Sequence, residues 1–248
     1  MAKLNLNNLQ VEVVNVIEPF YRELLTGLGD NLASIYLTGS ALGSDYIPKK
    51  SDINSLLIVK DVNEATLDSL SALGKQYGKK GVRAPLLMSP SYIERSLDVY
   101  PIEFLNLKAN NLLVYGTEYL ATLKIGNDNL RLQCERELKG ILINLQQSYI
   151  RSSGQLRVLN QLLADALSSF IPIFKGLIHL KGTEIPRDKK GVLDSIASTF
   201  ELDMASFHQI LTARQTASDF KLDGFKQVFF ECYRTLEELI SLVDSLNV

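Results

Sequence analysis

The hydrophobic pattern in the first half of the chain changes repeatedly between helical and extended spacing. Apolar residues recur every three or four positions over residues 9–28, which predicts a helix that packs on a sheet. Shorter helices are predicted over residues 65–77 and 92–97, the second capped by Ser91. Five short apolar or β-branched runs predict strands: 34–38, 53–59, 84–88, 102–107 and 112–115.

From Leu130 onward the apolar residues keep helical spacing. A long helix is predicted over residues 155–180, with a kink near Pro172, because its apolar stripe continues past the proline. A last helix is predicted over residues 225–246, where the same spacing returns. The second half of the chain is therefore expected to be helical.

The polar segment Gly126–Asn129 separates the two patterns, and a hydrophobic content of 46% in 248 residues is sufficient for two cores. We predict an α/β (α+β) mixed-sheet domain over residues 1–126. An all-α helical bundle domain is predicted over residues 127–248.

Charge and composition narrow the classes of partner. The formal net charge of -2 gives no global positive field for nucleic acid or an anionic membrane. The apolar stretch 170–180 is interrupted by Lys175, so a membrane span is not expected, and the start of the sequence lacks a secretory pattern. We expect a cytoplasmic protein. The two histidines are too few and too separated for a zinc site with close ligand spacing, and the two cysteines are expected to be buried on apolar helix faces.

The candidate chemistry lies between the first two strands. Gly39-Ser40 follows the strand at 34–38, and after eleven intervening residues Asp52-Ile53-Asn54 opens the next strand. A glycine lets backbone N–H groups approach a triphosphate closely, and the hydroxyl of Ser40 can add a donor. Asp52 and Asn54 occupy alternate strand positions and therefore project to one face, where oxygen ligands can hold magnesium ions.

This arrangement resembles the signature of the DNA polymerase β-like nucleotidyltransferase superfamily. There a Gly-Ser turn is followed by an Asp-x-Asp or Asp-x-Glu pair at the start of a strand and by a third carboxylate on a later strand. The order of a sheet domain and a helical domain is similar to that of kanamycin-type and streptomycin-type aminoglycoside nucleotidyltransferases. The resemblance implies Gly39, Ser40 and Ser51 as nucleotide-binding residues, and Asp52 and Asn54 as metal ligands.

The same resemblance implies a reaction and its participants. A nucleoside monophosphate would pass from a nucleoside triphosphate to a small hydroxyl-bearing acceptor or to a protein, with Mg²⁺ as the cofactor. The acceptor is unknown, and the oligomeric state is open between a monomer and a homodimer. Helical domains of this kind complete the acceptor pocket, so Arg131 and Glu135 are acceptor-side candidates. Their spacing equally fits a pair one helical turn apart on a solvated face.

Two departures from the family pattern bear on catalysis. Asn54 carries no charge, and the run at 84–88 contains no acid that could supply the third carboxylate. Glu103, on the predicted strand 102–107, is the remaining candidate, either as a catalytic metal ligand or base alongside Asp52 or as a buried, paired structural carboxylate. The alternative function is therefore a catalytically inactive nucleotide-binding or regulatory protein that acts through protein–protein contacts.

Overall fold

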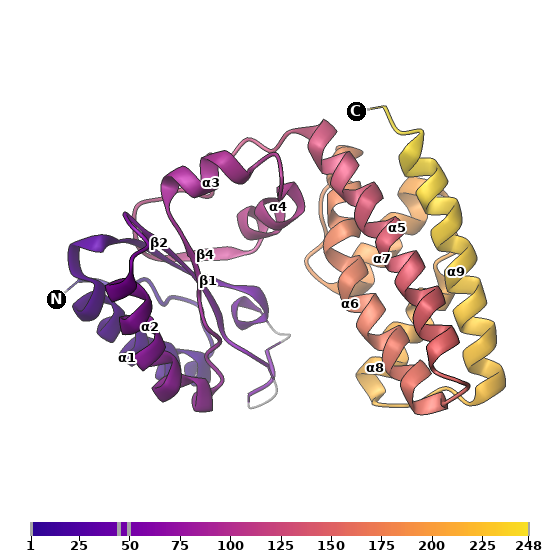
Figure 1. Cartoon of the computed structure of the whole chain (residues 1–248), viewed down its shortest axis with the longest axis horizontal. Helices are drawn as coiled ribbons and strands as arrows, with labels where there is room; N and C mark the ends of the chain where they lie inside the picture. Colours follow the sequence, from indigo (N-terminus) through magenta and orange to yellow (C-terminus); the bar gives the residue numbers. More distant parts are fainter. Residues whose placement is uncertain (1, 44–45, 49–50, 248) are drawn as a thin grey trace. The chain divides into compact units, whose positions relative to one another are not determined.

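The computed structural model of the protein describes residues 2–43, 46–48 and 51–247. Its contacts divide the chain into two compact units (Figure 1). The sheet unit comprises Met1–Leu97 and Asn106–Lys124, and the helical unit comprises Asp98–Leu105 and Ile125–Val248.

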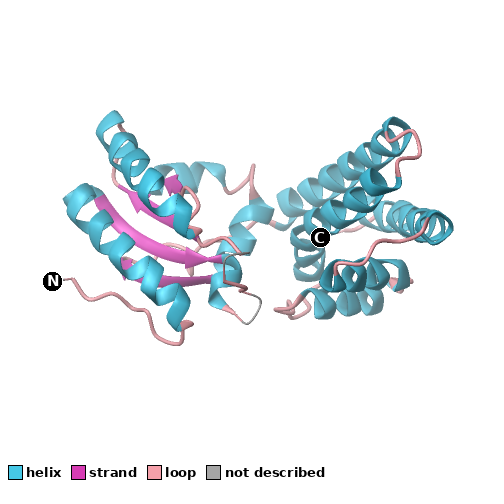
Figure 2. Ribbon diagram, turned by 90° about the horizontal axis from the view of Figure 1, so that it is seen from below, coloured by secondary structure: helices cyan, strands magenta, loops and turns pink. Residues whose placement is uncertain are grey.

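The sheet unit contains a mixed four-stranded sheet in the order β3-β2-β1-β4. The central strand β1 pairs antiparallel with both β2 and β4, whereas β3 runs parallel to β2. Figures 1 and 2 show α1 and α2 on the same side of this sheet. The elements of the unit are α1 (Val11–Leu28), β1 (Leu32–Thr38), β2 (Asn54–Val59), α2 (Glu64–Tyr77), β3 (Leu86–Met88), α3 (Pro90–Ser96) and β4 (Asn111–Gly116).

The two faces of β2 have different neighbours. The hydroxyl groups of Tyr21 on α1 and Ser55 on β2 are hydrogen-bonded at 2.8 Å in the buried core, which places Ser55 on the face covered by α1. Burial also raises the pKa of the Tyr21 phenol, so this hydroxyl stays protonated. Because strand side chains alternate, Asn54 lies on the opposite face. The first residue of β2 is thus exposed where α1 does not cover the sheet.

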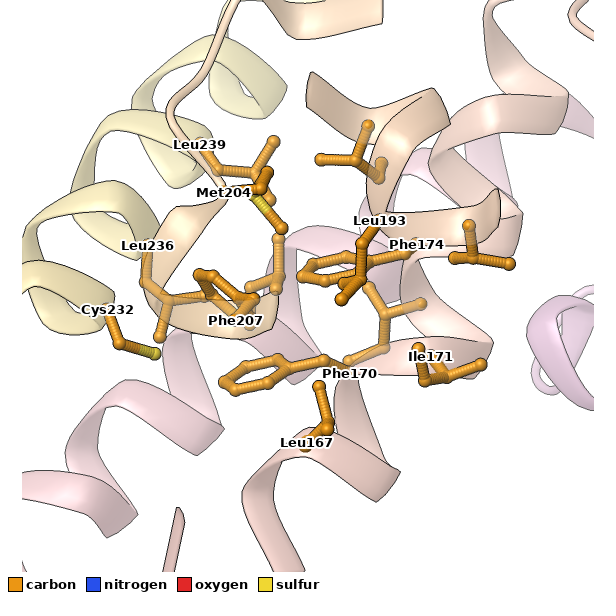
Figure 3. Packing of buried hydrophobic residues seen from close by; sticks show 14 of the residues in the cluster. Leu167, Phe170, Ile171, Phe174, Leu193, Met204, Phe207, Cys232, Leu236 and Leu239 are labelled. Atoms are coloured by element: carbon orange, nitrogen blue, oxygen red, sulfur yellow. The ribbon is translucent and has the colours of Figure 1, made fainter. Parts of the chain in front are cut away.

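The helical unit is built around α6, whose apolar side chains meet those of its neighbours in one continuous core (Figure 3). Phe170 and Phe174 on α6 contact Phe207 on α8, with ring centroids 5.6 and 5.7 Å apart respectively. The elements are α5 (Asn127–Arg151), α6 (Leu156–Leu180), α7 (Lys189–Phe200), α8 (Ala205–Thr216) and α9 (Leu222–Asp244). The α6 helix is long and apolar enough to span a membrane by composition, but 56% of its apolar window is buried inside the protein. It is therefore a core helix of this unit.

The prediction of a strand over 102–107 is wrong. These residues belong to α4 (Pro101–Ala109), which starts with a proline at a position where the missing N–H costs nothing. Ile102 and Leu105 are buried in the core of the helical unit. The periodicity of this short apolar run is compatible with a strand or a helix, and this packing favours the helix. The prediction that Ser91 caps α3 is also wrong: the cap is Ser89, two residues earlier, whose hydroxyl accepts the hydrogen bond from the Tyr92 N–H at 3.1 Å.

Candidate functional site

The turn after β1 leaves its backbone open. Gly39 has a φ of +79°, a conformation that residues with a side chain rarely adopt, and it begins the short 3₁₀ turn Gly39–Leu42. Thr38 pairs with Asn54 across the strands, and a methyl group added at Gly39 would lie 3.4 Å from Nδ2 of Asn54. The Asn54 amide is therefore next to the turn that the sequence identified.

Hydrogen bonds hold the described part of the loop between this turn and β2. The Gly43 N–H donates to the Ser40 carbonyl at 3.1 Å, and Nε2 of Gln10 donates to the Gly43 carbonyl at 3.1 Å. Ser51 and Ile47 are bonded twice, because the Ser51 N–H donates to the Ile47 carbonyl and the Ile47 N–H donates to the Ser51 hydroxyl. Ser51 thus closes the loop just before Asp52, and its contact with a nucleotide stays a prediction.

Asp52 forms an ion pair with Arg83, a residue that the sequence interpretation did not include. Nη2 of Arg83 lies 2.7 Å from Oδ2 of Asp52, and both side chains are exposed, at 66% and 44% respectively. The hydrogen bond and the charge of Asp52 raise the pKa of the Arg83 guanidinium, which therefore stays positively charged at neutral pH.

The backbone fixes Arg83 at this place. Ile53 and Val82 form a parallel bridge just ahead of β2 and β3. The Ile53 N–H donates to the Gly81 carbonyl at 2.8 Å, and the Arg83 N–H donates to the Ile53 carbonyl at 3.0 Å. Arg83 is therefore held next to the Asp52-Ile53 segment by two ladder bonds.

Glu103 is not on the sheet. It lies on α4, where Nε2 of Gln133 donates to its Oε2 at 2.9 Å. Oε1 of the same buried glutamine accepts from the Ile102 N–H at 2.8 Å. These contacts tie the start of α4 to α5 within the helical unit. Glu103 is therefore paired but exposed, not buried as one interpretation expected, and its catalytic role stays a prediction.

Arg131 and Glu135 also pair with each other. Nη1 of Arg131 lies 2.9 Å from Oε2 of Glu135 and donates to the Val243 carbonyl at 3.3 Å, which connects α5 to α9. Lys139 contacts the other carboxylate oxygen, and its hydrogen bond lowers the pKa of Glu135. The pair one helical turn apart is therefore present, whereas a contact with an acceptor stays a prediction.

The side chains at this edge of the sheet do not fit a two-metal site. Among the residues described between β1 and β2, Asp52 supplies the one carboxylate, its charge is balanced by Arg83, and Asn54 supplies a neutral amide. Among residues 2–43, 46–48 and 51–247, no three histidine, cysteine or acidic side chains come together as a metal-binding group.

The comparison with known structures identifies the fold. The chain matches the crystal structure of spectinomycin adenyltransferase AAD(9) from Enterococcus faecialis with ATP and spectinomycin, with a TM-score of 0.57 and 14% sequence identity. The match covers 90% of this chain and 99% of the other. No family model matches the sequence, and no curated protein does. The predicted fold is confirmed: the chain has the polymerase β-like nucleotidyltransferase fold, with a mixed four-stranded sheet followed by an all-helical region, as in AAD(9).

Proposed function

We propose that this protein binds a nucleoside triphosphate at the Gly39-Ser40 turn without transferring its nucleotidyl group, and acts through protein–protein contacts. The observation that carries the proposal is the side-chain set beside the turn. Gly39 keeps a positive φ that leaves its backbone accessible. The described residues, however, bring no group of three or more histidine, cysteine or acidic side chains together that could hold metal ions.

The charge count explains why turnover is not expected. A two-metal transfer depends on acidic ligands that hold the ions against the phosphates and stabilise the charge developing on pyrophosphate. Here Asp52 offers one negative charge, already balanced by the guanidinium of Arg83 at 2.7 Å, and Asn54 offers none. A magnesium ion would share Asp52 with Arg83 and, among the described residues at this turn, would gain one charged ligand.

A second candidate is the magnesium-dependent transfer of a nucleoside monophosphate to a small hydroxyl-bearing acceptor. The spacing from Gly39-Ser40 to Asp52 favours it, and the similar structure of AAD(9) was solved with ATP and spectinomycin. In that case Asp52 would be the main metal ligand and Asn54 an auxiliary one. The acceptor would contact the helical domain at 127–248, where Arg131 and Glu135 stay the candidates.

Two measurements separate the candidates. Isothermal titration with ATP, GTP, CTP and UTP reports whether any nucleotide binds, and a pyrophosphate-release assay with a panel of hydroxyl-bearing acceptors reports turnover. Nucleotide binding without pyrophosphate release is the expected result. Magnesium-dependent release that Asp52→Asn abolishes would establish the transferase instead. The cytoplasmic location and a homodimer stay predictions, to be checked by cell fractionation and by sedimentation.

A further inference from the structure

We propose that Arg83 and Asn54 bind the phosphates of the nucleotide directly, in the place where a related enzyme would use magnesium ions. The inference rests on the proposed nucleotide site. It adds a specific chemistry, because binding through these two donors does not need a divalent cation.

At position 54 a hydrogen-bond donor stands where the family pattern has a carboxylate acceptor. Two carboxylates offer oxygens only, so without a metal they repel a phosphate chain. An asparagine amide carries an NH₂ group that donates to phosphate oxygens, and Nδ2 of Asn54 is the atom closest to a methyl group built on Gly39. Of the two orientations of this amide, the one in the structure turns its donor toward the turn.

Arg83 presents an exposed guanidinium beside Asp52. A guanidinium has five N–H donors in a planar fork that matches phosphate oxygens, and Asp52 contacts it through Nη2. Within the described ranges Asp52 is the acidic partner of Arg83, and the arginine side chain is 66% exposed. Most of its donors are therefore directed to solvent, where a phosphate can reach them.

The net charge of Asp52, Asn54 and Arg83 and the spacing of residues 52 and 54 also favour direct contact with phosphate. An Asp-x-Asp pair without a metal carries two negative charges, whereas Asp52, Asn54 and Arg83 together carry none. Residues 52 and 54 are about 7 Å apart along the extended chain and share a face. One triphosphate chain can therefore reach both the guanidinium held by Asp52 and the amide of Asn54. Asp52 then acts as a positioning residue that orients Arg83 rather than as a metal ligand.

The test is isothermal titration of the full chain with ATP in EDTA and again in MgCl₂. We expect binding in EDTA, weakened by rising salt as for an exposed ionic contact. Arg83→Ala should lower the affinity about tenfold, the loss of one charge-assisted contact. Asn54→Asp should also lower it, because a carboxylate would replace a donor.

One further variant has opposite expected effects on ATP affinity under the two mechanisms, and a second variant serves as the control. Asp52→Asn should retain or raise affinity in EDTA, because the amide oxygen can still accept from the guanidinium and position it, while the negative charge that competes with phosphate is removed. A metal site would lose binding in the same variant. Arg22→Ala is the matched control, because Arg22 forms a 2.7 Å exposed ion pair with Glu18 on α1, which covers the other face of the sheet. Circular dichroism checks that each variant folds.

The outcomes distinguish this inference from the proposed function. ATP binding in both buffers, weakened by Arg83→Ala but not by Arg22→Ala, supports direct phosphate binding. Binding that requires MgCl₂ and disappears in Asp52→Asn overturns it while leaving a nucleotide site in place. Failure of all four nucleoside triphosphates to bind in either buffer overturns the proposed nucleotide site, and this inference with it.

Discussion

Gly39→Ala tests whether the backbone of the first turn is the part that meets the nucleotide. At a φ of +79° an alanine costs about 1–2 kcal/mol, and the smaller entropy of the unfolded chain offsets about 0.4–1 kcal/mol of this. The added methyl group would lie 3.4 Å from Nδ2 of Asn54, an ordinary contact that adds little strain. We therefore expect a loss of about 1 kcal/mol in the free energy of unfolding, measured with urea.

The effect on binding should be larger than the effect on stability. The methyl group occupies the approach to the backbone N–H groups, so the ATP affinity should fall at least about tenfold in isothermal titration. Gly154→Ala is the control, because Gly154 has the same φ of +79° with no atom within 4 Å of the added methyl group, and it lies between α5 and α6. It should lose similar stability and no affinity. Equal ATP affinity in Gly39→Ala and the wild type would refute the assignment of this turn.

Two further predictions concern the helical unit. A methyl group at Gly176 on α6 would lie 2.9 Å from Sγ of Cys134, so Gly176→Ala should cost about 1–3 kcal/mol of packing against about 1 kcal/mol of helix propensity. Gly140→Ala on α5, with open space around it, should stabilise by about 1 kcal/mol, and Cys134→Ala should rescue Gly176→Ala in a double-mutant cycle by urea unfolding. The hydrogen bond from Lys139 lowers the pKa of Glu135, so this carboxylate contributes stability above its unfolded pKa of about 4.3 and loses it as the pH falls through the folded value. The urea midpoints of the wild type and Glu135→Gln should therefore differ at pH 7, and the difference should shrink as the pH falls below the unfolded pKa; a constant difference would contradict this.

The elements with strong local signals were predicted from the sequence. The strand before Gly39 is confirmed by β1 (Leu32–Thr38), and the second strand is confirmed by β2 (Asn54–Val59). Both consist largely of buried β-branched and aliphatic residues next to a turn, a pattern that can be recognised within one segment. The long amphipathic helices are predicted for the same reason, since their period is visible within each helix.

The error at Glu103 has a different physical origin. Residues 102–107 form a short apolar run, and such a run is compatible with a strand or with one side of a buried helix. The choice depends on Gln133, which is thirty residues away and bonds both the Ile102 N–H and the Glu103 carboxylate. A tertiary contact of this kind leaves no periodic signal in the segment that it determines.

Arg83 shows why the site itself was only partly predictable. The Gly39-Ser40 turn and Asp52 were found because their chemistry and spacing are read along the chain. Arg83 reaches Asp52 through the register of two parallel segments, and that register is set by the bonds of Ile53 with the backbone on either side of Val82. Pairing between separate segments is not encoded in the spacing of either one.

The same register links two features of the site: the asparagine at position 54, where the family pattern has a second acid, and the position of Arg83. If Asn54 were the only departure, the site would be a weakened metal centre with an unbalanced Asp52. With Arg83 held 2.7 Å from Asp52, a second carboxylate at position 54 would instead give the arginine another acceptor and keep it from a phosphate. An amide avoids this competition and still donates. The two features together favour a site that binds an anion directly over a site that binds it through a metal ion.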